Sequence, residues 1–225
     1  MSEYILELKN VSKNFNQGDE IIHALKQTNF SIKKGEFVAI IGPSGSGKST
    51  FLTIAGALQT PSEGSVIING QDISKMNTRD LSKVRFNDIG FILQSSSLVP
   101  FLTIDEQLRF RDEISKANKS QTKRHELLKR LDIYNLKDKY PDDISGGEKQ
   151  RAAIAKVIYS DTNIILSDEP TASLDSHKAF DVVKILKKET HGNGKATIMV
   201  THDERLVKFC DKVYEMHDGS LRLKR

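Results

Sequence analysis

The stretch of sequence that decides the fold is "EFVAIIGPSGSGKSTFLTIAGAL", which runs from Glu36 to Leu58. It opens with a short apolar run that ends at a glycine, a pattern typical of a fully buried strand. It closes with apolar residues at helical spacing, including Phe51, Ile54 and Ala55. Between the two lies a loop of glycine and serine. The stretch therefore predicts a buried strand, a tight glycine-rich loop and an amphipathic helix, in that order.

The loop itself, "GPSGSGKS", matches the pattern G-x-x-x-x-G-K-[ST] in full. Its glycines let the backbone curl so that N–H groups point inward at phosphates. Lys48 is expected to reach the β- and γ-phosphates of a nucleotide, and the Ser49 hydroxyl to ligate Mg²⁺. A chance glycine-rich turn would not require both a strand before it and a helix after it. We therefore expect nucleotide contacts from Gly42, Pro43, Ser44, Gly45, Ser46, Gly47, Lys48, Ser49 and Thr50.

Three further apolar runs end at polar residues. "NIILSDEP" places Asp168 and Glu169 at the end of a buried strand, the edge where open α/β sheets bind ligands. Asp168 is predicted to hold Mg²⁺ through water, and Glu169 to polarise a water for attack on the γ-phosphate. "ATIMVTHD" places His202 past another strand end, within reach of the γ-phosphate, and "GFILQ" ends at Gln94, a candidate contact of Mg²⁺ or the attacking water. The plainer alternatives are a surface histidine and a turn glutamine.

A second phosphate-binding element lies in "YPDDISGGEKQRAAIAK", from Tyr140 to Lys156. Ser145, Gly146 and Gly147 directly precede an amphipathic helix, and a helix N-terminus preceded by small residues is an anion site. Only the first of the two elements carries the usual lysine. The sequence therefore raises the question of why one chain has two.

Composition places the chain among globular proteins. It has 225 residues, 37% hydrophobic and 28% charged, and a mean hydropathy of −0.42. No apolar run reaches the roughly 20 residues that span a bilayer, and "MSEYILELKN" does not resemble a signal peptide, so we expect a cytoplasmic location. The single cysteine, Cys210, excludes an internal disulfide and is expected in the core. The net charge of +4 is mild and decides nothing about partners.

The order of the predicted elements gives the fold class. Strands are expected at 5–15, 36–42, 64–70, 88–94, 163–170 and 196–203, and a hairpin at 211–223 turns at Asp218-Gly219. Helices follow the glycine-rich loop and cover 177–189, and the region from 103 to about 140 is helical and charged. We predict one α/β domain with a mostly parallel sheet and an N-terminal antiparallel part. Residues 1–94 and 160–225 form the core, and 95–159 form a helical subdomain.

These motifs together resemble the ATP-binding cassette family, the motor subunits of ABC transporters, over nearly the whole chain. "GPSGSGKS" is similar to its Walker A loop, Gln94 to its Q-loop glutamine, "SGGEKQ" to its signature and "IILSDE" to Walker B. "SLD", ending at Asp175, resembles the D-loop, and His202 the switch histidine. Phe15 falls where the family stacks an aromatic residue on adenine, commonly a tyrosine. Ile144 replaces a leucine and Lys156 an arginine, and both replacements are small.

The resemblance implies an answer to the question of two elements. Two subunits of the family pair head to tail, so the signature of one covers the γ-phosphate held by the other's Walker A loop, in a twofold arrangement. Ser145, Gly146, Gly147 and Glu148 would then contact the partner's ATP, with Asp175 beside them. We therefore expect a homodimer that forms on ATP binding, with Mg²⁺ as the metal.

The resemblance also implies a membrane partner. A separate permease would dock a helix into a groove near Gln94, lined by "SSSLVPFLTIDEQL". Within the family, this segment is most similar to ATPases of macrolide and antimicrobial-peptide exporters, lipoprotein release, cell division and above all haem efflux. Three functions stay open: an exporter motor at the inner face of the membrane, an ATPase that pulls on a membrane partner without moving a solute, and a nucleic-acid-linked ATPase. The last lacks a basic patch with interleaved aromatic residues, so we expect no nucleic acid.

Overall fold

The computed structural model describes residues 3–116 and 120–225. Its central sheet has six strands in the order β10-β9-β3-β8-β7-β6. The five strands from β9 to β6 run parallel, and β10 joins β9 as an antiparallel edge. The strands are β3 (Phe37–Ile41), β6 (Ile89–Ile92), β7 (Ile164–Asp168), β8 (Ala196–Val200), β9 (Lys212–His217) and β10 (Ser220–Leu223).

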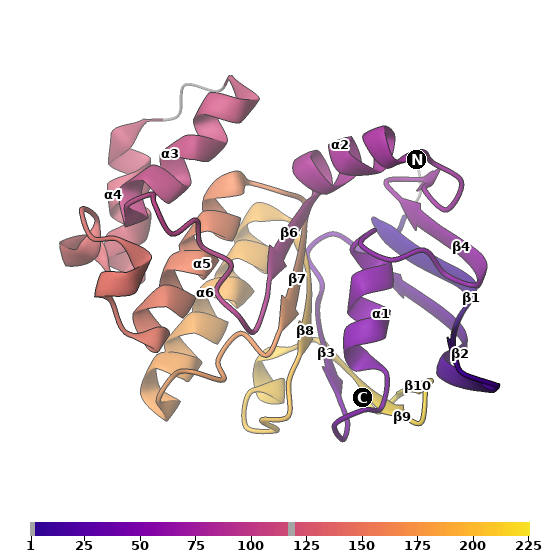
Figure 1. Ribbon diagram of the computed structural model, residues 1–225. Helices are drawn as coiled ribbons and strands as arrows, with labels where there is room; N and C mark the ends of the chain where they lie inside the picture. Colours follow the sequence, from indigo (N-terminus) through magenta and orange to yellow (C-terminus); the bar gives the residue numbers. More distant parts are fainter. Residues whose placement is uncertain (1–2, 117–119) are drawn as a thin grey trace.

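A second sheet lies on the far side of helix α1 from the central sheet (Figure 1). Its four strands, in the order β2-β1-β4-β5, are antiparallel throughout. They are β1 (Leu6–Gln17), β2 (Glu20–Ile32), β4 (Glu63–Ile68) and β5 (Gln71–Asp72). This is the antiparallel part that the N-terminal sequence predicts.

The helices cover both faces of the central sheet. α1 (Lys48–Ala55) lies between the two sheets, whereas α5 (Gly146–Ser160) and α6 (Ser176–Asn193) pack on the opposite face (Figure 1). α3 (Ile104–Ser115) and α4 (Gln121–Arg130) pack outside α5, and α2 (Thr78–Asp88) precedes β6. Short 3-10 helices cover Tyr134–Leu136, Pro141–Asp143 and Val207–Phe209.

Strand β3 shows how the sheet divides the interior into two cores. All five of its residues are buried. Phe37, Ala39 and Ile41 face the core shared with α3, α5 and α6, whereas Val38 and Ile40 face the core shared with α1 and the antiparallel sheet. A strand covered on both faces is apolar at every position, which is why "FVAII" shows no alternation.

The structure confirms the predicted fold class and adds elements that the sequence patterns did not show. The mostly parallel sheet, the antiparallel N-terminal part and a cluster of helices are all present. Helix α2 was not predicted, and it has no buried residue that would give it an apolar stripe. Its Asn77 cap, which accepts the Asp80 N–H, supplies a local start instead. Strand β2 was also not predicted as a separate element. The subdomain boundaries at 95 and 159 stay a prediction.

The core between α6 and the sheet supplies a test of this packing. Leu186 is fully buried on α6. Leu186→Ala should lower the free energy of unfolding by about 2–5 kcal/mol, because truncation removes apolar contacts and leaves a cavity. Leu223→Ala is the matched control, because Leu223 is 60% exposed and its loss should cost less than about 0.5 kcal/mol. Urea unfolding of both variants measures the difference, and equal losses would contradict the assignment of this core.

Candidate nucleotide site

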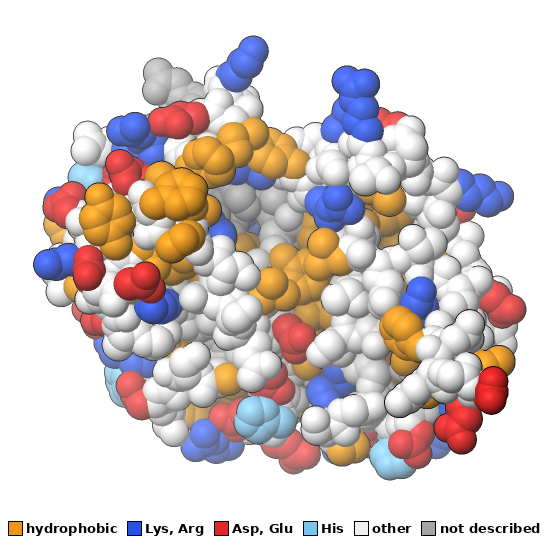
Figure 2. Space-filling view, viewed as in Figure 1, with side chains coloured by type: hydrophobic (Ala, Val, Ile, Leu, Met, Phe, Trp, Pro, Cys, Tyr) orange, Lys and Arg blue, Asp and Glu red, His pale blue; other side chains and the backbone are white. Residues whose placement is uncertain are grey.

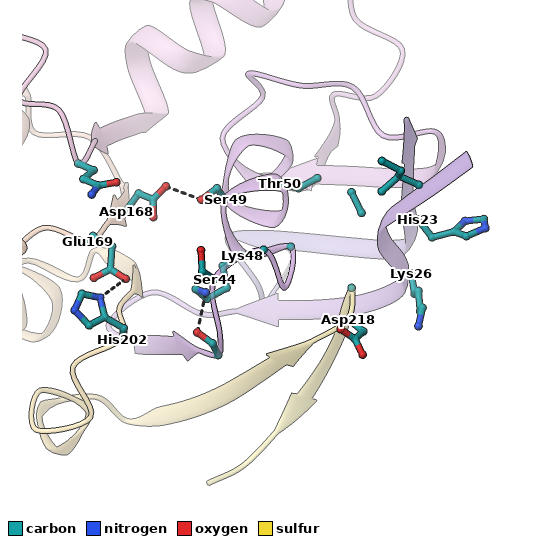
Figure 3. A pocket seen from close by; sticks show the side chains of 17 residues that line it. His23, Lys26, Ser44, Lys48, Ser49, Thr50, Asp168, Glu169, His202 and Asp218 are labelled. Atoms are coloured by element: carbon teal, nitrogen blue, oxygen red, sulfur yellow. Dashed lines mark hydrogen bonds and ion pairs between the residues drawn. The ribbon is translucent and has the colours of Figure 1, made fainter. Parts of the chain in front are cut away.

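A cleft of 710 Å³ opens at the C-terminal edge of the parallel strands (Figure 3). Most of the glycine-rich loop lines it, as do Gln94, Asp168, Glu169 and His202. The residues that the sequence assigned to nucleotide, metal and catalysis from β6, β7, β8 and the loop therefore meet in one place. Pro43 is exposed outside this lining, and Ser46 is buried beneath it.

Lys48 holds the loop closed from within. Its ammonium donates to the carbonyl oxygens of Gly42 at 2.8 Å and Pro43 at 2.7 Å, and the side chain is 8% exposed. These two contacts hold the ammonium inside the curve of the loop. The Ser46 hydroxyl is buried and has no hydrogen-bond partner within the described part of the chain. The Lys48 ammonium inside the curve of the loop fits an anionic ligand.

Two glycines of the loop are required by close packing. A Cβ on Gly42, at φ 148°, would lie 2.1 Å from the Met216 carbonyl oxygen, and one on Gly47, at φ 104°, would lie 2.4 Å from that of Ala24. Neither backbone can retreat without breaking its own sheet. The loop is therefore shaped by β9 and β2 as well as by its own sequence.

Two of the three predicted metal ligands, Ser49 and Asp168, touch each other. Ser49 Oγ donates to Asp168 Oδ2 at 2.9 Å, at the start of α1 and the end of β7. A hydroxyl and a carboxylate at this separation fit Mg²⁺, which takes one or two protein oxygens together with substrate phosphates. Gln94 lines the same cleft and is available to the same ion.

Glu169 and His202 form the second pair of the cleft (Figure 3). His202 Nδ1 lies 2.9 Å from Glu169 Oε1. The backbone of Glu169 is left-handed, at φ 48°, a strained conformation that clusters at functional sites. Its other oxygen, Oε2, is buried and has no partner among residues 3–116 and 120–225. The histidine thus holds the carboxylate in place through one of its oxygens.

The signature residues lie outside this cleft. Ser145 caps α5 in a reciprocal arrangement: the Glu148 N–H donates to Ser145 Oγ, and the Ser145 N–H donates to Glu148 Oε2. The Ser145 hydroxyl and N–H together lower the pKa of the Glu148 carboxyl. Asp175 caps α6, and the Lys178 N–H lowers the pKa of its carboxyl. Neither group lines the cleft of its own chain.

Several cleft residues were not found from the sequence. Ile22, His23 and Lys26 of β2 line the cleft, and so do Asp218 and Gly219 of the β9–β10 turn. Phe15, expected beneath adenine, does not line it. Phe15 pairs with Ile22 across β1 and β2, is 38% exposed and has Lys13 Nζ 5.3 Å from its ring centre. The Asp218-Gly219 dipeptide was a signal, but only for a hairpin turn.

Fold and cleft together define a nucleotide-hydrolysing enzyme of the P-loop class. Comparison with known proteins gives the family, because the model of the ABC transporter family matches residues 25–172 of this chain. HrtA of Staphylococcus haemolyticus, named as a hemin import ATP-binding protein, is 43% identical over 97% of this chain and 99% of its own. MJ0796 of Methanocaldococcus jannaschii, an ABC transporter ATP-binding protein, is 39% identical over 96% of this chain and 95% of its own.

The solved structures agree. The MJ0796 cassette, determined as a dimer in a post-hydrolysis state bound to ADP and Pi, superposes with a TM-score of 0.89 over 98% of this chain and 99% of that one. The chain belongs to the ABC transporter family and is an ATP-binding protein that hydrolyses ATP. No helix among the described residues has the length and apolar character needed to cross a membrane.

The position of Lys48 supplies a test of the cleft. Lys48→Ala should weaken ATP binding at least about tenfold and abolish hydrolysis, because it removes the cation and the contacts that close the loop. Lys184→Ala is the control, since Lys184 is an exposed lysine of α6. Isothermal titration and phosphate release on folded protein measure both steps. Near wild-type binding by the Lys48 variant would contradict the site.

Proposed function

We propose that the chain is the ATP-driven motor of a separate membrane permease and acts as a head-to-tail dimer. The observation that carries this proposal is the separation of the two phosphate-binding elements. The cleft supplies loop, metal ligands and base, while Ser145–Gly147 begin a helix on the other face of the sheet (Figure 1). A second copy that places its Ser145 over this cleft would complete the site. The dimeric MJ0796 structures support the arrangement.

The residues of the cleft divide the chemistry among them. Lys48 and the inward N–H groups of the loop stabilise the charge that develops on the γ-phosphate. Glu169 accepts a proton from the attacking water, and His202 fixes the orientation of the carboxylate. Mg²⁺, held by Ser49, Asp168 and Gln94, would neutralise phosphate charge when bound.

The partner is a permease that docks near Gln94. Figure 2 shows hydrophobic side chains gathered around a hollow between α3 and α2. Three large apolar residues of this region are exposed, namely Phe101 at 76%, Phe110 at 45% and Ile114 at 52%. Large apolar side chains gathered on one face mark an interaction site. Docked there, the chain would lie on the cytoplasmic face of the membrane through its permease.

Haem is the substrate we favour, and export the direction. The HrtA relatives are named as hemin import proteins, which supports haem as the substrate. We favour export over import because the segment from Gly90 to Leu108 resembles haem-efflux ATPases. A peptide or drug-like substrate would use the same motor. The second candidate function is an ATPase that pulls on its membrane partner without moving a solute, since the cleft would be the same.

Dimerisation tests the central step. Glu169→Gln removes the proton acceptor, so hydrolysis should fall about 10²–10⁴-fold while ATP stays bound. That protein should be a monomer without nucleotide and a dimer with ATP. Adding Ser145→Arg should prevent the dimer, because the larger side chain occupies the γ-phosphate position of the partner's site. Multi-angle light scattering with and without ATP distinguishes these states.

A matched control separates this effect from loss of a helix cap. Ser120 caps α4 through the Thr122 N–H, as Ser145 caps α5, but α4 carries no signature. Glu169→Gln with Ser120→Arg should therefore still dimerise on adding ATP, and each chain of every variant should still bind ATP. A Ser145→Arg protein that dimerises as well as its parent would contradict the proposal.

Direction is tested with the permease that co-purifies with the chain. In inside-out vesicles, export predicts ATP-dependent accumulation of hemin in the lumen, and import predicts ATP-dependent loss from preloaded vesicles. Glu169→Gln should abolish either movement. ATPase activity stimulated by the permease without movement of hemin, peptide or drug would favour the mechanical alternative.

A further inference from the structure

The segment that follows β6 is the least regular part of the permease-facing side. From Gln94 to Leu102 it has neither helix nor strand. Ser97, at φ 42°, is left-handed without being a glycine, a conformation that persists only when the surroundings hold it. The contacts that hold this turn therefore decide its position.

Helix α5 holds the first half of the segment from two points. The Gln150 side chain, 1% exposed, donates to the Leu93 carbonyl at 3.2 Å. Lys156 Nζ donates to the Ser97 carbonyl at 2.6 Å. The two residues are six positions apart on one helix, or about 9 Å along its axis. Any movement of α5 therefore reaches the backbone on both sides of Gln94.

Helix α3 holds the second half. Gln107, 2% exposed, accepts the Val99 N–H at 3.0 Å and donates to the carbonyls of Val99 at 2.6 Å and Leu102 at 2.9 Å. Between the Gln150 and Gln107 contacts, Lys156 is the side chain from α5 that reaches the strained residue of the turn.

Partial burial of the Lys156 ammonium beside this turn costs free energy. The residue is half-buried, burial lowers the pKa of its ammonium, and it forms no ion pair with a carboxylate in the described ranges. A methionine would fill similar space without burying a charge. The hydrogen bond to Ser97 is the interaction that the lysine adds.

We propose that Lys156 is a positioning residue that couples the signature to the permease-facing turn. α5 begins at the Ser145 cap, where the partner's nucleotide would bind, and Lys156 ties the same helix to Ser97. Seating of the nucleotide at Ser145 is then passed through α5 to the turn at 95–98. This inference rests on the proposed head-to-tail dimer.

Hydrogen exchange measured by mass spectrometry tests the coupling in the Glu169→Gln protein. On adding ATP, exchange should slow both in the peptide covering 145–150 and in the one covering 95–99. With Lys156→Met added, the protein should still dimerise and slow at 145–150, but the slowing at 95–99 should be lost. We expect a change of about tenfold at the turn, the size that loss of one hydrogen bond from a charged donor typically gives. Lys156→Arg keeps a charged donor and should restore the response.

Lys184→Met, which removes an exposed lysine of α6, should behave as its parent. If Lys156→Met does not fold, Lys156→Gln, whose amide is too short to reach, replaces it. If exchange at the turn still slows with ATP in the folded methionine or glutamine variant, the inference alone is overturned. The same holds if the turn of the Glu169→Gln parent does not respond to ATP while residues 145–150 do. A Glu169→Gln protein that neither dimerises nor slows at 145–150 overturns the proposed dimer and the inference with it.

Discussion

The structure depends on the conformation of one loop, which is curved so that it can bind an anion. Between β3 and α1 the backbone must turn its N–H groups inward, against the tendency of a glycine-rich chain to collapse or fluctuate. Lys48 closes the loop from inside through the carbonyls of Gly42 and Pro43. The β9–β10 turn braces it from outside, since the Gly219 N–H donates to the Ser46 carbonyl at 2.9 Å and the Gly219 carbonyl accepts the Lys26 N–H at 2.8 Å.

This bracing explains why the antiparallel sheet belongs to the same domain as the parallel core. Strand β2 passes so close to the loop that Gly47 has no room for a side chain, and the same strand lines the cleft with Ile22, His23 and Lys26. The glycine-rich loop is thus shaped by local sequence together with β2 and β9, and the rest of the cleft is built by strands that arrive from elsewhere in the chain. Both parts must fold for either to hold its shape.

That division also sets how much could be predicted from the sequence. Lys48 and Ser49 were predictable because they complete the glycine-rich loop pattern. Asp168 and Glu169 were predictable because they follow a buried strand, and parallel strands bring such ends to one edge. Gly219 was not, because its role depends on tertiary packing that no local pattern records. Helix α2 was missed for a related reason: no residue of it is buried, so its sequence shows no apolar stripe, and its start depends on the Asn77 cap.

The start of α5 has the hydrogen-bond donors that the proposed contact with a partner's phosphate requires. The capping box satisfies the N–H groups of Ser145 and Glu148, whereas those of Gly146 and Gly147, in the first turn, have no acceptor within the helix. Ser145 Oγ donates to Glu148 Oε2 at 2.7 Å, so without a nucleotide the hydroxyl is engaged by its own helix. A phosphate must compete with that carboxylate for the hydroxyl while it gains two free N–H groups and the helix dipole. An anion with concentrated charge competes for this helix start better than a water molecule does, which suits Ser145, Gly146 and Gly147 to the phosphate contact proposed for them.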